Sequence, residues 1–480
     1  MWIADLIRKV LRKLLPHNSI EKELSVEVVT SGAMERALDI WIEMYNNVPY
    51  WKGESSIALN IPAAISTEFS RLILTEFTIL CEGSPEAEFI QSQIDKRLSA
   101  LPDYMEKYAA FGGIAIKPYV TDADEEGKPT SINLDFVYAD DFYPTAFDSN
   151  GMVTGAVFVQ TKKNGKYLYT RLEYHVLEGT TYTVTNKAYE STEINNYLDQ
   201  NKFTVKDRFH KQVPLETIPE WAGLSEEPVV IEDIEKPLFV YIKTPIGNNV
   251  DIGSPLGVSV YARAVESIKE ADIQYGRLIW EFDATEAAVF ADSSLFNMDR
   301  EGNPILPEGE ERKYVTFSMD MQKDGNMLVP YGPAIREESI IRGYNRHLQT
   351  IESQCGLAFG TLSDPQVVTM TATQVKHSKD ASYRTVNLMQ AAWDKGLHDL
   401  VDAMKTLVEL YEIVPEGNVE VTCTWGDGVL EDPVEEYNRR WQWVVAGYYR
   451  PEKFFAEYLG CSEEEALAAM PKRFEFPAEE

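Results

Sequence analysis

The strongest constraint on the fold of this chain is a helix–insert–helix pattern between residues 254 and 356. Ser254 and Pro255 are residue types that favour the cap and the first turn of a helix. Eight residues then recur at alternating spacings of three and four, with one acidic interruption: Val258, Tyr261, Val265, Ile268, Asp272, Tyr275, Ile279 and Phe282. This seven-residue pattern predicts a helix of about 42 Å with one continuous stripe. A mixed insert follows, and a second helical run over residues 335–355 predicts the returning arm of a stalk.

The stripe on the first helix needs a partner, because moving apolar side chains out of water lowers the free energy. Other copies of the same chain are one such partner. Asp272 interrupts the stripe, and two interpretations remain open for it. In the favoured one the helix rotates so that Asp272 faces solvent; in the other, Asp272 makes a polar contact that sets the register of the packing.

Composition limits the kind of protein. The chain has 480 residues, of which 44% are hydrophobic, so it can bury a sizeable core and is expected to form two to four domains. Its 77 acidic residues against 45 basic ones give a formal charge of −32, which disfavours non-specific binding to nucleic acid. The four cysteines form no CxxC pair, so a reduced, intracellular protein is expected.

No apolar run approaches the roughly 18 residues that span a bilayer. Residues 1–20 are predicted to form an amphipathic N-terminal arm, with Arg8, Lys9, Arg12 and Lys13 opposite an apolar face. This pattern is compatible with a helix on a membrane surface. An arm that docks on protein is the favoured interpretation, and no membrane partner is expected.

The spacing of apolar residues predicts helices over residues 31–48, 62–80 and 86–111, with a break at Pro102 and an end at Gly112-Gly113. Later, the spacing predicts a long helix from Thr371 or Thr373 to about Tyr411. A strand is predicted over residues 419–425. Short acidic helices, which include residues 435–446 and 463–470, are predicted after it.

Between these helical regions, residues 114–245 are predicted to form an antiparallel, tyrosine-rich sheet. Asn150-Gly151 and Asn164-Gly165 are strong hairpin signals, since two-residue turns require positive φ. The predicted strands lie at residues 114–119, 155–160 and 166–175, and the insert of the stalk adds strands at residues 287–290 and 314–318. Together, helices and antiparallel strands predict the α+β class.

The chain lacks the common catalytic motifs, namely GxxxxGK[ST], HExxH and GxSxG. Its six histidines are scattered without the spacing of metal ligands, so neither a metal nor a cofactor is expected. Asp140-Asp141 and Glu125-Glu126 are candidate carboxylate pairs, although solvated loops are the favoured interpretation. An acidic carbohydrate-active enzyme built on the sheet is therefore an alternative that no motif supports, and we expect a protein that is not an enzyme.

Three stretches resemble the portal proteins of long-tailed, double-stranded DNA bacteriophages. Residues 253–257 and 264–269 are similar to the opening of the first stem helix of that family. Residues 355–363 and 371–375 resemble its tunnel loop and the start of the long helix behind it. Gln374 departs from the pattern, because many family members have a glutamate there.

The third stretch comprises Gly426-Asp427, Asp432-Pro433 and residues 444–447, which are similar to the passage from strand to crown. The three stretches follow the family order across roughly 230 residues, whereas the N-terminal half is similar in style only. The resemblance implies the following domains. The wing comprises residues 21–250, the two stem helices residues 251–283 and 335–356, and the clip residues 284–334. The tunnel loop comprises residues 357–370, a long helix with a wing strand residues 371–425, and the crown residues 426–480.

The resemblance implies a homo-oligomeric ring, usually of twelve subunits, at one vertex of the capsid. Double-stranded DNA passes through such a ring, and its partners are the terminase packaging motor, the head–tail adaptor, and capsid and scaffold proteins. The chain is then expected in the virion, after assembly in the cytoplasm of the bacterial host. A different phage structural protein, such as a minor head or baseplate component without a channel, is the alternative.

The resemblance also implies three sets of site residues. The stripe from Val258 to Phe282 is expected to pack between subunits. The tunnel loop is expected to present side chains to DNA, although an ordinary connection between helices is the alternative; these side chains are Phe359, Thr361, Ser363, Asp364 and Gln366. The clip is expected to bind partners through its basic residues Arg300, Arg312, Lys313 and Lys323.

Overall fold

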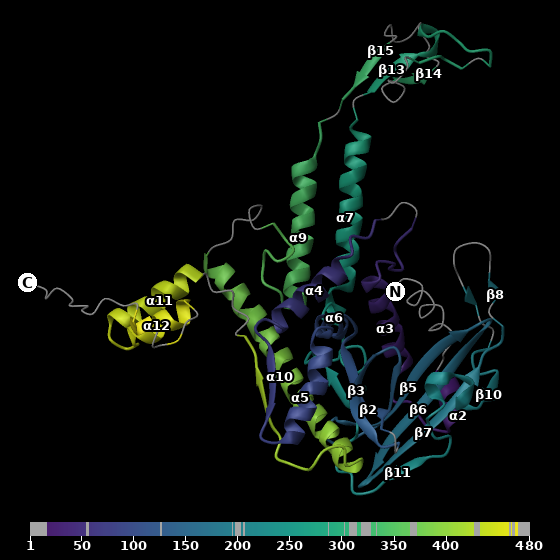
Figure 1. Ribbon diagram of the computed structural model, residues 1–480. Helices are drawn as coiled ribbons and strands as arrows, with labels where there is room; N and C mark the ends of the chain where they lie inside the picture. The colour runs from purple at the N-terminus through teal and green to yellow at the C-terminus, as the bar shows by residue number, and fades with distance from the viewer. Residues whose placement is uncertain are drawn as a thin grey trace, which may run out of the picture. The chain divides into compact units, whose positions relative to one another are not determined.

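The computed structural model of this chain describes residues 17–53, 57–124, 127–193, 195–196, 203–204, 207–286, 288–301, 303–306, 314–317, 328–332, 334–364, 372–426, 433–459, 462 and 466–468. Helices and strands both contribute to the fold, which confirms the predicted α+β class (Figure 1). The chain divides into two compact units, residues 1–426 and 427–480, which are described separately. Residues 1–16 of the predicted N-terminal arm lie outside the described residues. No helix in the described part of the chain has the length and apolar character that a membrane crossing needs.

The first unit begins with a group of helices, as the sequence predicts. They are α2 (His17–Leu24), α3 (Gly32–Tyr45), α4 (Ile61–Ile73), α5 (Pro85–Leu98) and α6 (Leu101–Phe111). Ser31 caps α3 by accepting a hydrogen bond from the Met34 backbone N–H, and Gly112 ends α6 with a φ of 85°. Pro102 lies in the first turn of α6, where proline is tolerated.

One prediction in this region is wrong. The helix expected over residues 62–80 ends at Ile73, and Thr78–Glu82 forms strand β1 instead. Strand β1 pairs with β16 (Glu420–Thr424), with Thr78 opposite Thr424. The pairing partner lies far along the chain, so local spacing could not reveal the strand.

The predicted sheet region consists of separate antiparallel sheets. Strands β12 (Val240–Lys243), β2 (Gly113–Ala123) and β3 (Pro129–Tyr138) form the first, in that order. The second has the order β10-β7-β6-β5-β4, and β11 also pairs with β7. Its strands are β4 (Phe142–Phe147), β5 (Val153–Asn164), β6 (Tyr167–Glu178), β7 (Thr181–Glu190), β10 (Lys211–Val213) and β11 (Val229–Ile231). The remaining short elements are β8 (Asn195–Asn196), β9 (Phe203–Thr204), η1 (Leu215–Thr217) and η2 (Pro219–Trp221).

Both predicted hairpins form, but their turns differ from the prediction. Asn164 pairs with Tyr167, so the two turn residues between β5 and β6 are Gly165-Lys166, and Gly165 has a φ of 58°. Phe147 pairs with Val153, so a five-residue loop joins β4 and β5 rather than a two-residue turn. The Asp148 carboxylate accepts hydrogen bonds from the Asn150 and Met152 backbone N–H groups, which explains the longer loop.

The first stalk helix is shorter than expected. Residues 254–261 are not helical; η3 (Ala262–Ala264) leads into α7, which spans Val265–Ala284. The segment before α7 is held instead by contacts with the end of α6. The Val260 N–H donates to the Ala109 carbonyl, and a Cβ at Gly257 would collide with the Gly112 carbonyl oxygen. Because these contacts use the backbone of the segment, Ser254 and Pro255 do not open a helix.

The later helices agree closely with their predictions. The returning helix α9 spans Glu337–Cys355, and the long helix α10 spans Ala372–Leu410. α10 packs into the main core, where Trp393 lies against Tyr108 with ring centroids 5.3 Å apart. This core also includes side chains from α3 to α6 and from the sheet β12-β2-β3.

The second unit contains α11 (Pro433–Val445) and α12 (Pro451–Leu459), and residues 466–468 are also helical. The first of these confirms the helix predicted over residues 435–446. Aromatic side chains join α11 to α12. Tyr437 and Phe454, for example, have ring centroids 5.4 Å apart.

Candidate functional site

Helices α7 and α9 lie side by side and form the predicted stalk (Figure 1). The Tyr275 and Tyr344 rings join them, with centroids 5.6 Å apart. Near the end of α7, the Arg336 guanidinium donates to the buried Glu281 carboxylate at 3.0 and 2.7 Å. These hydrogen bonds hold the pKa of Glu281 below its ordinary value. The two helices therefore pack together as a pair within a single chain.

At the base of the pair, the predicted stripe is part of the chain's own core. Val258, Tyr261 and Ile268 are buried, and the Tyr261 hydroxyl donates to the Trp41 carbonyl at 2.8 Å. Val265 and Tyr275 are half-buried. The expectation that the whole stripe packs between subunits is therefore wrong for its first half, because the chain already covers these side chains.

Asp272 lies at the same base and is only 3% exposed. Its carboxylate accepts hydrogen bonds from the Trp51 indole N–H at 2.9 Å and from the Leu59 backbone N–H at 3.0 Å. Burial raises the pKa of Asp272, although these two hydrogen bonds act against the rise. The interpretation that Asp272 faces solvent is wrong, and the polar contact that the structure contains is made within the chain.

The far half of the pair has the opposite character. On α7, Ile279, Trp280 and Phe282 are 37%, 64% and 48% exposed. Ile335, just before α9, and Ile341 within it are exposed as well. We call these five side chains the far apolar set. The stripe predicted Ile279 and Phe282, whereas Trp280, Ile335 and Ile341 fell outside its spacing.

The loop after α9 is anchored to that helix by two buried side chains. Glu352 accepts hydrogen bonds from the Leu362 N–H at 2.6 Å and from both the N–H and the hydroxyl of Ser363 at 2.8 Å. Asn345 exchanges two hydrogen bonds with the backbone of Asp364, at 2.8 and 3.1 Å. These hydrogen bonds therefore hold residues 362–364 of the loop against α9.

This anchoring changes the set of loop side chains that can face a ligand. Ser363 is buried against Glu352, so its prediction as a DNA-facing residue is wrong. Thr361 and Asp364 are exposed and Phe359 is half-buried. Gln366 lies outside the described residues. Glu352 and Asn345 themselves were missed, because a buried polar residue on a helix has no distinctive local signal.

The chain between α7 and α9 forms a small sheet, β14-β13-β15, which lies beyond the far ends of the two helices (Figure 1). Its strands are β13 (Ala288–Asp292), β14 (Tyr314–Phe317) and β15 (Leu328–Tyr331), and η4 (Ser293–Leu295) follows β13. The first two confirm predicted strands, and β15 was missed. Arg300 is exposed here. The other predicted clip residues, Arg312, Lys313 and Lys323, lie outside the described residues.

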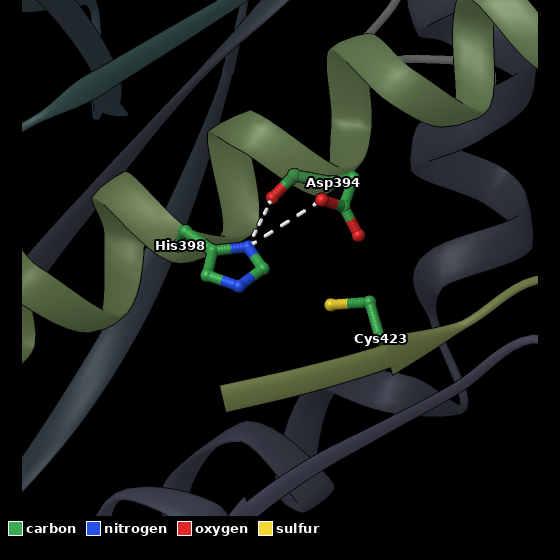
Figure 2. Close-up of side chains that lie close together, drawn as sticks. All are labelled: Asp394, His398 and Cys423. Atoms are coloured by element: carbon green, nitrogen blue, oxygen red, sulfur yellow. Dashed lines mark hydrogen bonds and ion pairs between the residues drawn. The ribbon is translucent and has the colours of Figure 1, made fainter. Parts of the chain in front are cut away.

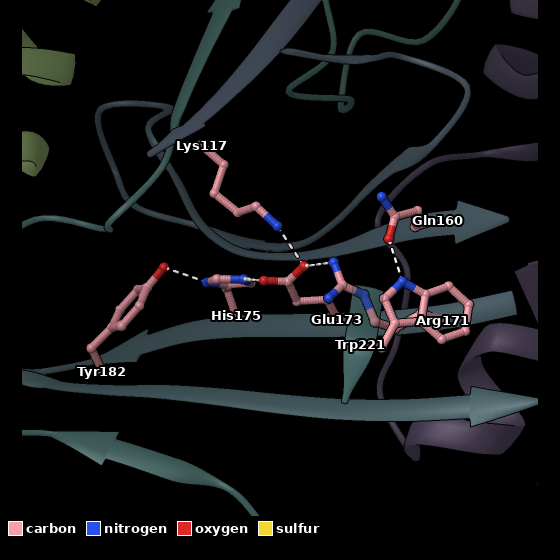
Figure 3. A network of polar contacts seen from close by, with 7 residues as sticks. All are labelled: Lys117, Gln160, Arg171, Glu173, His175, Tyr182 and Trp221. Carbon is pink, nitrogen blue, oxygen red and sulfur yellow. Dashed lines mark hydrogen bonds and ion pairs between the residues drawn. The ribbon is translucent and has the colours of Figure 1, made fainter. Parts of the chain in front are cut away.

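A buried charge network joins the two larger sheets (Figure 3). Lys117 of β2 pairs with Glu173 of β6, and Arg171 donates to the same carboxylate at 2.8 Å. His175 Nε2 lies 2.9 Å from Glu173, and His175 Nδ1 lies 2.7 Å from the Tyr182 hydroxyl. The pairing fits a tautomer that donates to Glu173 and accepts from Tyr182. This network is a joint between sheets.

Burial works against the charge on Glu173, yet Lys117, His175 and Arg171 together hold its pKa well below the ordinary value. Burial lowers the pKa of His175, in spite of the neighbouring carboxylate. Of the carboxylate pairs considered from the sequence, Asp140-Asp141 is half-buried, and Glu125-Glu126 lies outside the described residues.

One group of possible metal ligands escaped the sequence patterns. Asp394 and His398 of α10 lie beside Cys423 of β16, with one ligand atom from each within 4.8 Å of the others. The four-residue spacing of Asp394 and His398 on a helix was a usable signal, but the contribution of a distant strand was not. Cys81, Cys355 and Cys423 are free thiols, and burial raises the pKa of Cys81 to about 11 and that of Cys423 to about 12.

Comparison with known proteins adds no identification: no family model matches this chain, and a search of curated proteins finds no match.

Proposed function

We propose that this chain is the subunit of a phage portal, a ring-shaped channel at one capsid vertex for DNA packaging, retention and ejection. The observation that carries the proposal is that the far apolar set is exposed on a chain with a high negative charge. Trp280, Phe282 and Ile279 lie on one helix and are between 37% and 64% exposed. Burial of their side chains would lower the free energy by roughly 25 cal/mol per Å² of apolar surface. In a closed ring, each helix pair packs against its neighbours, so these side chains are covered.

The order of elements supports the same proposal. A helix, a small sheet, a returning helix, an anchored loop and a helix of 39 residues follow one another. In a portal these elements are the stem, the clip, the tunnel loop and the long helix behind it. The small sheet β14-β13-β15 would then meet the terminase packaging motor and later the head–tail adaptor. Thr361 and Asp364 are the described loop residues that remain candidates for contact with DNA.

The charge of the chain fits a conduit. Duplex DNA carries about one negative charge per 1.7 Å of axis, so a basic wall would hold the phosphates and slow their passage. A net charge of −32 per chain weakens such binding. We therefore expect an acidic channel with few Lys or Arg side chains on its wall, and a strongly basic channel in an assembled ring would contradict this expectation.

Such a subunit would assemble in the cytoplasm of the bacterial host, with capsid and scaffold proteins as partners, and would remain in the virion. Twelve copies are expected from the resemblance.

Electron microscopy of the purified chain tests the proposal. We expect closed rings with a central hole in the class averages. Particles without a hole would favour a minor head or baseplate protein and would overturn the portal proposal.

A further inference from the structure

The packing of α10 against β16 brings together three side chains that commonly bind transition metals (Figure 2). Asp394 and His398 lie one helical turn apart on α10, and Cys423 points toward them from the strand. Asp394 and His398 are 41% and 45% exposed, so an ion can reach them from solvent. Cys423 is half-buried and closes the site from the protein side.

Hydrogen bonds already orient two of the three side chains. His398 Nδ1 lies 2.8 Å from the Asp394 backbone oxygen, which accepts a hydrogen bond from it and leaves Nε2 with a free lone pair. Histidines that bind metals usually donate their second ring N–H in this way. The Trp425 indole N–H donates to Asp394 Oδ1 at 3.1 Å and fixes that carboxylate.

We propose that Asp394, His398 and Cys423 form a binding site for Zn²⁺ or a closely related divalent ion. One carboxylate oxygen, one imidazole nitrogen and one thiolate would bind the ion, and water would occupy the fourth position. On binding, the Cys423 thiol proton leaves to solvent as the metal–sulfur bond forms, so no oxidant or reductant is needed.

The choice of metal follows from the donors. A thiolate and an imidazole favour Zn²⁺ and its neighbours over Mg²⁺ or Ca²⁺, which prefer oxygen ligands. Tetrahedral zinc sites have ligands at about 2.0–2.3 Å, which places the donor atoms roughly 3.5 Å apart. One ligand atom from each residue, a ring nitrogen in the case of His398, lies within 4.8 Å of the others, so the site must close by about 1 Å through side-chain rotation.

The ion would act as a structural link. Asp394 and His398 belong to a helix of the main core, whereas Cys423 belongs to the two-stranded ribbon of β1 and β16. A bound metal would therefore tie this ribbon to α10. Trp425 is a positioning residue in this account, because it acts on the ion only through Asp394.

Metal titration of the full, untagged chain after chelator treatment tests the proposal. Co²⁺ is the optical probe, because a thiolate bound to Co²⁺ gives a charge-transfer band. We expect one Co²⁺ per chain with this band, its displacement by one equivalent of Zn²⁺, and a rise in the Tm on addition of Zn²⁺.

Substitutions locate the site. Cys423→Ser should remove the band, whereas Cys81→Ser, on the paired strand, should keep it. Asp394→Asn and His398→Gln change half-buried side chains at the surface, and we expect both variants to fold. Each should weaken Co²⁺ binding at least tenfold and remove the rise in Tm. Trp425→Phe should weaken binding about tenfold and keep the band. A wild-type chain without the band, a band that survives Cys423→Ser, or a His398→Gln variant that binds Co²⁺ as tightly as the wild type would overturn the proposal.

Discussion

The two halves of the helix pair α7 and α9 carry similar residue types in opposite surroundings. At the base, the apolar side chain of Ile268 is buried, and the carboxylates of Asp272 and Glu352 accept hydrogen bonds from donors of the same chain. At the far half, Trp280 and Phe282 are exposed. A repeating apolar pattern therefore marks a surface to be covered, but it does not tell whether the same chain or another copy covers it.

This comparison predicts that substitutions at the base alter folding and that substitutions at the far half alter assembly.

Glu352→Ala should lower the free energy of unfolding by about 4 kcal/mol, because three donors of the following loop lose their buried acceptor. Urea unfolding measures the change. Glu338→Ala on the exposed face of the same helix is the matched control and should change stability by less than about 0.5 kcal/mol. Equal effects of the two substitutions would show that the loop is not anchored as described.

Asp272→Leu should lower the free energy of unfolding by about 3 kcal/mol, since the Trp51 indole N–H and the Leu59 N–H lose their acceptor. Glu270→Leu, at an exposed position of the same helix, is its control. If Asp272→Leu left folding unchanged but altered the size of the assembly, Asp272 would be an inter-subunit residue after all.

Low pH should destabilise the folded chain by protonating His175 and Glu173 in the buried charge network that joins the two sheets. The folded pKa of His175 lies below its ordinary 6.5, so the stability that it contributes is present above pH 6.5 and is lost as the pH falls below that value. The folded pKa of Glu173 is also depressed, so its contribution is lost as the pH falls through 4.5 toward the folded value.

The urea midpoint, measured from pH 7 to pH 4, checks this prediction. His175→Gln should flatten the upper part of the curve, between pH 7 and pH 5, because it removes the group that titrates there. A variant curve parallel to that of the wild type would exclude His175 as the source.

Trp280→Ser with Phe282→Ser should have the smallest effect on the folding of one chain, about 0.5 kcal/mol or less for each substitution, because both side chains are already exposed. The same double variant should lose assembly. Leu80→Ser and Val230→Ser, which alter exposed side chains on strands outside the helix pair, are the matched control and should assemble normally.

The comparison also shows what the sequence predicts and where prediction fails. Helices α9 and α10 follow from local spacing, and the structure agrees. The β5–β6 hairpin also forms, with its turn one residue later than predicted. The start of α7 was predicted too early because Gly257 meets Gly112 from another helix, a contact that local patterns do not contain.

The site residues were harder to predict for the same reason. Asp272 bonds to residues 213 and 221 positions away, and Cys423 lies beside His398 because β16 packs against α10. The sequence does not distinguish a buried acidic residue from an exposed one, so only the fold identifies its hydrogen-bond partners. Exposed apolar residues such as Trp280 can likewise be assigned to a contact surface only once the base of the helix pair is known to be covered by the same chain.

We infer that other copies of this chain cover the far apolar set. The most direct test is the native mass of the purified wild-type chain beside that of the Trp280→Ser, Phe282→Ser double variant. We expect a closed oligomer of twelve copies for the wild type and a folded monomer for the variant. A monomeric wild type, or a variant that assembles to the same mass, would contradict it.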